Sequence, residues 1–362
     1  MDKETLSQCL SLGWGTRLDG NTKGLGRFGF GLKGSSISQA RRVEVYSWQN
    51  IDWKKEDFNS IKINMASLDM DRIREEKLIV LDEVEKKSLP QEIVGSFGYK
   101  IKKLHSGTLV VWSELDSIKF KKSVGLISQI NKELCRIYRH FLYGGEFSDI
   151  RNINIQELNL KTRKINTIKL KPNDPLYLMT PNNLKGHENE ATNVEHQKAF
   201  SSNIEYEDRD GNISKSEVVF KMSIAKPEIQ ALLGLSATGQ HYENNTGISF
   251  IRAGREIDFD TFGFLSNSEP RHRWWGMEIG FNPELDELFG VTNSKQNVLA
   301  IKRLTKAQRS EFLSDDDLDY SEKLLIEINK VIDENITEMM KIVKGRGKGK
   351  GTQKERDPIK DK

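Results

Sequence analysis

The sequence predicts an α+β fold in two main parts, and three observations predict it. The chain has 362 residues, which is more than one compact core usually contains. Near the N-terminus, short helical patterns are followed by runs of alternating apolar and polar residues, which are typical of antiparallel strands. After a longer helical pattern at 124–142, strand-like runs resume and a final amphipathic helix follows.

The first part is predicted to contain three helices and three strands. Gly13 and Gly15 end the first helical pattern, and a polar, glycine-rich segment separates it from the second. The third pattern repeats apolar side chains at every third or fourth position, which predicts one amphipathic helix that closes the first domain. The predicted helices are 4–12, 32–40 and 124–142, and the predicted strands are 41–48, 60–66 and 107–115.

The second part is predicted to be mainly strands. A polar stretch from 181 to about 203 predicts a loop between them. The last helical pattern, 321–343, carries its apolar side chains along one stripe, which indicates core packing more than a dimer seam. The predicted strands are 153–158, 167–171, 217–225, 247–257 and 274–281.

Composition argues against a membrane protein and gives little support for nucleic acid across the whole surface. The chain has 56 Lys and Arg against 53 Asp and Glu, a net charge of only +3. No run approaches the roughly 18 uncharged apolar residues that a membrane span requires. The N-terminus lacks the plan of a secretory signal, and Cys9 and Cys135 both lie in helical patterns, so we expect a cytoplasmic protein. Residues 344–362 alternate glycine with lysine, which predicts a disordered basic tail that either contacts DNA or only aids solubility.

The glycines of residues 22–36 fit several phosphate-binding patterns by spacing but only one by context. Gly24-x-Gly26-x-x-Gly29 matches the dinucleotide pattern, yet a helix and a loop precede it where that pattern needs a strand. The Walker pattern needs Gly-Lys-Ser/Thr, whereas residues 31–34 read Gly-Leu-Lys-Gly. A protein kinase would have strands on both sides of its glycine-rich loop and its lysine in the next strand. What fits is a flexible lid whose backbone amides, at the start of the next helix, face nucleotide phosphates.

The segment GRFGFGLKGSSIS, residues 26–38, resembles the third ATP-binding motif of the GHKL superfamily, which includes gyrase, heat-shock chaperones, histidine kinases and MutL. Its Gly-x-x-Gly-x-Gly-Leu-Lys form is most similar to MORC-like ATPases. The resemblance implies that this lid binds the phosphates of ATP. The residues it implies in that role are Gly24, Gly26, Arg27, Phe28, Gly29, Phe30, Gly31, Leu32 and Lys33.

Two later segments also resemble this superfamily. HSGTLVVWSELD, residues 105–116, is similar to the fourth motif, which implies that Gly107 and Thr108 contact adenine, Thr108 through its hydroxyl and a water. GISFIRAGREID and GFNPELDELFGVTNSKQNV look like the transducer domain of ribosomal-S5-like fold. In that domain a lysine reaches the terminal phosphate, and Lys295, followed by Gln296, occupies that position. Without the resemblance, Lys295 would be interpreted as a solvated loop lysine.

The resemblance implies a specific fold and domain order. It implies an N-terminally incomplete Bergerat-type ATP-binding α/β sandwich, then a transducer domain and a C-terminal helix. The expected domains are 1–145 for ATP binding, 146–304 for the transducer, 305–343 for the helical segment and 344–362 for the tail.

Two motifs of the superfamily are expected upstream of this chain, which begins at the methionine that closes the second. They hold a water-activating glutamate, an asparagine for Mg²⁺ and an aspartate for adenine. The implied cofactors are ATP and Mg²⁺, but no catalytic residue or metal ligand is assigned here, so we expect weak ATP binding and negligible hydrolysis. Three explanations stay open: a misassigned start, a split gene whose upstream product completes the site, and a degenerate remnant.

The leading functional hypothesis is an ATP-gated clamp that homodimerises when nucleotide binds, with DNA as its client. A chaperone-like protein-binding ATPase and a non-enzymatic interaction module are the alternatives. The run of basic and aromatic residues at 271–275 is interpreted as an anchor of the second sheet rather than a nucleic-acid surface. His187, Glu188, Glu195 and His196 match no usual zinc spacing.

Overall fold

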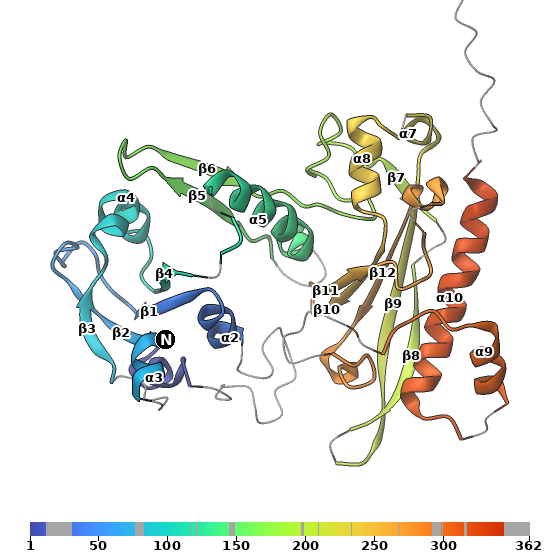
Figure 1. Cartoon of the computed structure of the whole chain (residues 1–362), viewed down its shortest axis with the longest axis horizontal. Coiled ribbons are helices and arrows are strands. Elements are labelled where there is room, and N and C mark those ends of the chain that lie inside the picture. The colour runs from blue at the N-terminus through green and yellow to red at the C-terminus, as the bar shows by residue number, and fades with distance from the viewer. Residues whose placement is uncertain are drawn as a thin grey trace, which may run out of the picture.

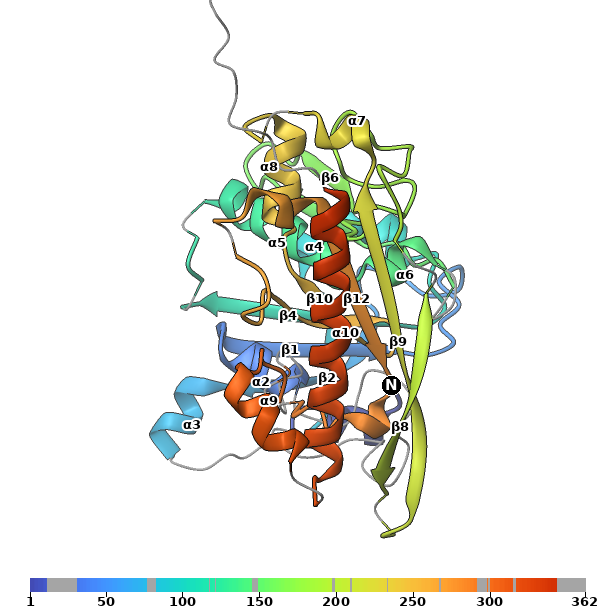
Figure 2. The same ribbon diagram turned by 90° about the vertical axis from the view of Figure 1, so that its right-hand side faces the viewer.

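The computed structural model describes residues 1–11, 31–76, 83–116, 118–120, 122–144, 149–196, 199–208, 210–232, 234–266, 268–291, 298, 300–314 and 317–343. Over these ranges the fold is α+β, with helices packed against mainly antiparallel sheets. Figures 1 and 2 show one sheet formed by the N-terminal part of the chain and a second, longer one that carries the C-terminal helix. No helix in these ranges has the length and apolar character needed to cross a membrane.

The first sheet has four antiparallel strands in the order β3-β2-β1-β4, so β4 is an edge among the described strands. The central strand β1 pairs Ser47 with Thr108 and Trp48 with Gly107 of β4. This register places the start of β4 beside the end of β1. The strands are β1 (Ala40–Trp48), β2 (Lys62–Asp69), β3 (Glu85–Ser88) and β4 (Gly107–Leu115).

Alternation along the strands gives this sheet two apolar faces, and each face has its own helices. Val43 and Val45 point to the face where Leu6 and Leu10 pack, at α1 and the turn that follows it. The opposite face carries an aromatic cluster and is covered by α4. The helices are α1 (Lys3–Gln8), α2 (Gly31–Ile37), α3 (Met70–Glu76) and α4 (Gln91–Ile101). The aromatic cluster contains Tyr46, Trp48, Trp53 and Phe58.

The single helix predicted over 124–142 is wrong, because the structure divides it into α5 (Ser123–Ile137) and α6 (Arg139–Tyr143). Tyr138 separates them with φ −107° and ψ 18°, outside the helical region. Beyond the break, Arg139 and His140 contact carboxylates of the second sheet, a contact that apolar periodicity does not reveal. Both helices contact β11 (Arg255–Asp260) of that sheet, and α5 also contacts the hairpin of β5 (Asn154–Leu158) and β6 (Ile165–Lys169).

The second sheet has the order β11-β10-β12-β9-β7, and β8 also pairs with β9. Its β10 and β12 strands are parallel, and the other pairs are antiparallel. The predicted loop from 181 to 203 contains β7 and the start of β8, because a three-residue strand is too short to show alternation. The strands are β7 (Asn193–Glu195), β8 (Phe200–Glu207), β9 (Ile213–Ala225), β10 (Ile248–Arg252), β11 (Arg255–Asp260) and β12 (Trp275–Phe281).

The C-terminal helix α10 (Tyr320–Ile342) lies along the second sheet, as Figure 2 shows. A capping box formed by Asp319 and Glu322 begins it. Its predicted apolar stripe is core, with Ile328, Ile332 and Met339 fully buried. Trp275 Nε1 donates to Asn335 Oδ1 of this helix, which confirms that a tryptophan anchors the second sheet. Shorter helices complete this part: α7 (Pro227–Gln230), α8 (Ala237–Asn244), η1 (Pro270–Trp274), η2 (Pro283–Leu285) and α9 (Lys306–Leu313).

Candidate nucleotide site

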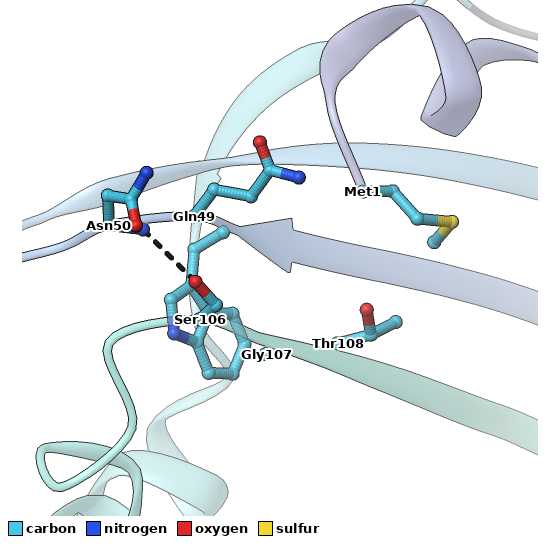
Figure 3. A pocket seen from close by; sticks show the side chains of 7 residues that line it. Met1, Gln49, Asn50, Ser106, Gly107 and Thr108 are labelled. Atoms are coloured by element: carbon cyan, nitrogen blue, oxygen red, sulfur yellow. Dashed lines mark hydrogen bonds between the residues drawn. The ribbon is translucent and has the colours of Figure 1, made fainter.

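A pocket of about 450 Å³ opens where β1 ends and β4 begins. Figure 3 shows that its side chains come from three separate segments of the chain. The first is the N-terminus, the second is the end of β1, and the third is the start of β4. The lining residues are Met1, Trp48, Gln49, Asn50, Ser106, Gly107 and Thr108. Two of these residues, Gly107 and Thr108, were singled out from the sequence as adenine contacts.

Hydrogen bonds fix Met1 and Thr108 to the same serine. The terminal nitrogen of Met1 donates to Ser47 Oγ at 2.6 Å. Ser47 Oγ lies 3.3 Å from Thr108 Oγ1, its directly opposite partner across the two strands. Ser47 is buried, so it positions the other two residues without facing the pocket itself. In Figure 3 the Thr108 hydroxyl and the Met1 side chain lie on the same side of the sheet.

Gly107 has a packing role as well as its place in the pocket wall. A Cβ atom built on it would lie 2.3 Å from Cζ2 of Trp48, closer than atoms can approach. The indole is held in place because its Nε1 donates to the carbonyl of Leu104 at 3.1 Å. Only glycine therefore allows this ring to pass under the start of β4.

The lining side chains carry hydroxyl, amide and apolar groups, and the charge among the lining residues is the terminal ammonium of Met1, which is bonded to Ser47 Oγ. Phosphate binding in proteins relies on arginine, lysine or exposed backbone amides, whereas the edge of a nucleobase needs neutral donors and acceptors. The lining therefore fits the base of a nucleotide better than its phosphates. It includes no carboxylate, so these residues do not fit a Mg²⁺ ion. Over the described part of the chain, no three His, Cys, Asp or Glu residues come together as a metal site.

The end of the predicted lid lies at the start of α2. Gly31, Leu32 and Lys33 are its first three residues, and Leu32 packs against the core beneath α1. Lys33 is only 2% exposed, and desolvation lowers the pKa of its ammonium group while the nearby Cys9 thiol opposes that shift. Burial raises the pKa of Cys9 to about 11. Lys33 is thus inside the domain and does not line the pocket.

Trp112 connects α2 with the strand that carries Thr108. Its Nε1 donates to Ser36 Oγ of α2 at 2.9 Å. Thr108 and Trp112 are four residues apart on one face of β4, which corresponds to roughly 13 Å along a strand. The pocket and the last turn of α2, at Ser36, thus lie along one strand.

Several residues implied in the site lie outside the described residues. They are Gly24, Gly26, Arg27, Phe28, Gly29, Phe30, Lys295 and Gln296. On either side of the last two, Val291 and Val298 form an antiparallel bridge. The basic tail 344–362 is also outside the described ranges.

Sequence reasoning missed a buried charged cluster between α6 and the second sheet. Arg139 is fully buried, and it donates to Glu256 Oε2 at 2.5 Å, to Glu278 Oε2 at 2.7 Å and to Ser249 Oγ at 2.6 Å. Burial disfavours its charge, but the carboxylates of Glu256, Glu278 and Asp174 outweigh burial and raise its pKa. The available signal was Glu278, a charged residue within the otherwise apolar strand β12.

Comparison with protein-family models finds no family that matches the chain, and comparison with curated proteins finds no significant match either.

Proposed function

We propose that this chain is the nucleotide-binding and transducing part of a GHKL-type ATPase that acts as an ATP-gated, homodimerising clamp. The observation that carries the proposal is the convergence of Met1 and Thr108 on one pocket. The resemblance implies that Thr108 contacts adenine and that Met1 closes the motif whose aspartate pairs with adenine, although more than a hundred positions separate the two residues in the sequence. The α+β fold is compatible with this assignment.

The composition of the pocket supports one orientation of the nucleotide. The wall of neutral side chains at Thr108 takes the base, and the phosphates extend along β4 toward α2 and the glycine lid. Because Lys33 is buried, the backbone amides of the lid, rather than this ammonium group, bind the phosphates. When bound, ATP would supply the γ-phosphate that Lys295 recognises from the second part of the chain.

The contacts of α5 and α6 support a transducing role for the second part. These helices follow β4 directly in the chain, and Arg136 and Arg139 pair with carboxylates of the second sheet. A change in the position of β4 is therefore connected to the second sheet through these ion pairs. In the proposed clamp, DNA is the client and residues 344–362 contribute positive charge to its backbone.

The test is nucleotide binding to the chain and to Thr108→Val, measured by titration calorimetry up to millimolar ATP. Valine keeps the shape of threonine and removes the hydroxyl, so ATP affinity should fall about five-fold, the value of one hydrogen bond. Thr167→Val, an exposed threonine on β6, is the matched control and should bind as the unchanged chain does. Absence of ATP binding to the unchanged chain, or equal affinity in Thr108→Val, would contradict the proposal.

A further inference from the structure

We propose that Gln49 reads the base in this pocket, and that its neutral amide lets the site accept either purine. The inference rests on the proposed function, because it assigns the base end of a nucleotide to this pocket. Gln49 was not among the residues that the sequence indicated. Its place in the structure, next to the strand pair that carries Thr108, brings it into the site.

The pairing of β1 with β4 brings Gln49 to the pocket that Thr108 lines. Ser47 is the direct partner of Thr108, and Gln49 is the first residue after β1, which ends at Trp48. Both Gln49 and Thr108 line the pocket. Figure 3 shows the amide of Gln49 between Asn50 on one side and Met1 and Thr108 on the other.

The other polar groups of the pocket are already hydrogen-bonded within the protein. Trp48 Nε1 donates to the carbonyl of Leu104, and Ser106 Oγ accepts from the backbone nitrogen of Asn50 at 3.2 Å. The hydroxyl of Thr108 contacts Ser47 Oγ, and because a hydroxyl has one donor and two acceptor sites it can still make the ligand bond proposed above. Within the described part of the chain, the side-chain amides of Gln49 and Asn50 are left for a ligand. In the view of Figure 3, the side chain of Gln49 lies between those of Asn50 and Thr108.

An amide presents one donor and one acceptor, and it can exchange them by turning over. Against adenine, Gln49 Nε2 would donate to N1 while Oε1 accepts from the N6 amino group. Against guanine, the turned amide would donate to O6 and accept from N1–H. Both purines therefore match Gln49 with two hydrogen bonds, and the site should bind ATP and GTP within about ten-fold of each other.

A carboxylate at the same position would not bind the two bases equally well. Glutamate offers only acceptors, which match the N1–H and N2 amino donors of guanine. Against adenine, one of its oxygens would face the lone pair of N1. Gln49→Glu should therefore shift the preference toward GTP by at least about ten-fold, since one bidentate pair is worth that much discrimination.

The experiment is calorimetric titration of ATP and GTP into four forms of the full chain. These are the unchanged chain, Gln49→Ala, Gln49→Glu and the control Gln129→Ala, which removes an exposed amide on α5. We expect Gln49→Ala to weaken both nucleotides about five- to ten-fold, Gln49→Glu to favour GTP, and Gln129→Ala to change nothing. Thermal unfolding of each variant checks that these exposed substitutions leave the fold intact.

Each other outcome overturns a different statement. If no nucleotide binds to the unchanged chain, the proposed function fails, and this inference fails with it. If nucleotides bind but Gln49→Ala has no effect, Gln49 does not read the base. If Gln49→Glu weakens ATP and GTP equally, the carboxylate is repelling phosphates, and the nucleotide lies in the opposite orientation.

Discussion

Arg139 Nη2 of α6 donates to Glu278 Oε2 of β12 at 2.7 Å, and both side chains are buried. His140 Nε2 lies 2.9 Å from the same carboxylate oxygen. Burial would raise the pKa of Glu278, but the adjacent His140 and Arg139 lower it well below its usual range. The carboxylate is therefore charged at neutral pH, and α6 supplies its counter-charge. This ion pair joins two segments that are 139 positions apart in the sequence.

Arg139→Met should strongly destabilise the protein. The substitution preserves length and removes the charge, which leaves Glu256 and Glu278 buried without their main partner. Breaking a buried ion pair in this way typically costs about 3–5 kcal/mol. Chemical denaturation should show this loss in the free energy of unfolding.

A surface pair provides the matched control for Arg139. Arg41 pairs with Asp71 at 2.8 Å, but its side chain is 42% exposed. Arg41→Met should therefore cost less than about 1 kcal/mol. Equal losses of unfolding free energy in Arg139→Met and Arg41→Met would show that the buried cluster stabilises the fold no more than a surface ion pair does.

His241 of α8 should make stability depend on pH in the mildly acidic range. Burial, with a smaller contribution from Lys132, lowers its pKa to about 4, and Tyr177 Oη lies 2.9 Å from its Nδ1. The unfolded chain binds a proton near pH 6.5, whereas the folded chain resists protonation until about pH 4. Stability is thus fully present above pH 6.5 and falls as the pH decreases toward 4, by at most about 3 kcal/mol.

The measurement is the free energy of unfolding between pH 4 and 8 for the unchanged chain and for His241→Gln. Glutamine does not titrate, so the free energy of unfolding should fall less between pH 6.5 and 4 in the variant than in the unchanged chain. The difference should be at most about 3 kcal/mol. Parallel curves for the two proteins would show that His241 does not cause the loss. The difference between the curves isolates this residue from the carboxylates that titrate in the same range.

The sequence predicted the elements that have a strong period and missed those that do not. The strand 107–115 and the long C-terminal helix are confirmed, because alternation and an apolar stripe along a helix of 23 residues both repeat enough to be recognised. The helix α4 was not predicted, since Gly95 and Gly98 interrupt its pattern. In the structure Gly98 has a packing reason, because a Cβ there would lie 2.6 Å from the ring of Phe58.

The residues of the candidate site also divide into those that the sequence indicated and those that it missed. Gly107 and Thr108 were indicated because they open a strand within a longer motif, and both line the pocket. Gln49 had no such signal, since a glutamine after a strand is common and only the meeting of β1 with β4 brings it to the pocket that Thr108 lines. The buried cluster at Arg139 depends on three strands and a helix meeting in space, which local periodicity does not encode.

Gly107→Ala should destabilise the protein and distort the pocket, because the new methyl group would occupy the position of the Trp48 indole. That ring can move only by losing its hydrogen bond to Leu104 and its edge contact with Trp53, whose ring centroid is 6.1 Å away. Overpacking of this kind typically costs about 1–3 kcal/mol.

Gly95→Ala is the matched control, since a Cβ there meets nothing within 4 Å. It should stabilise α4 by about 0.5–1 kcal/mol. Thermal and chemical unfolding of both variants would reveal opposite signs, and a stable Gly107→Ala protein would mean that Trp48 is not fixed beneath the pocket.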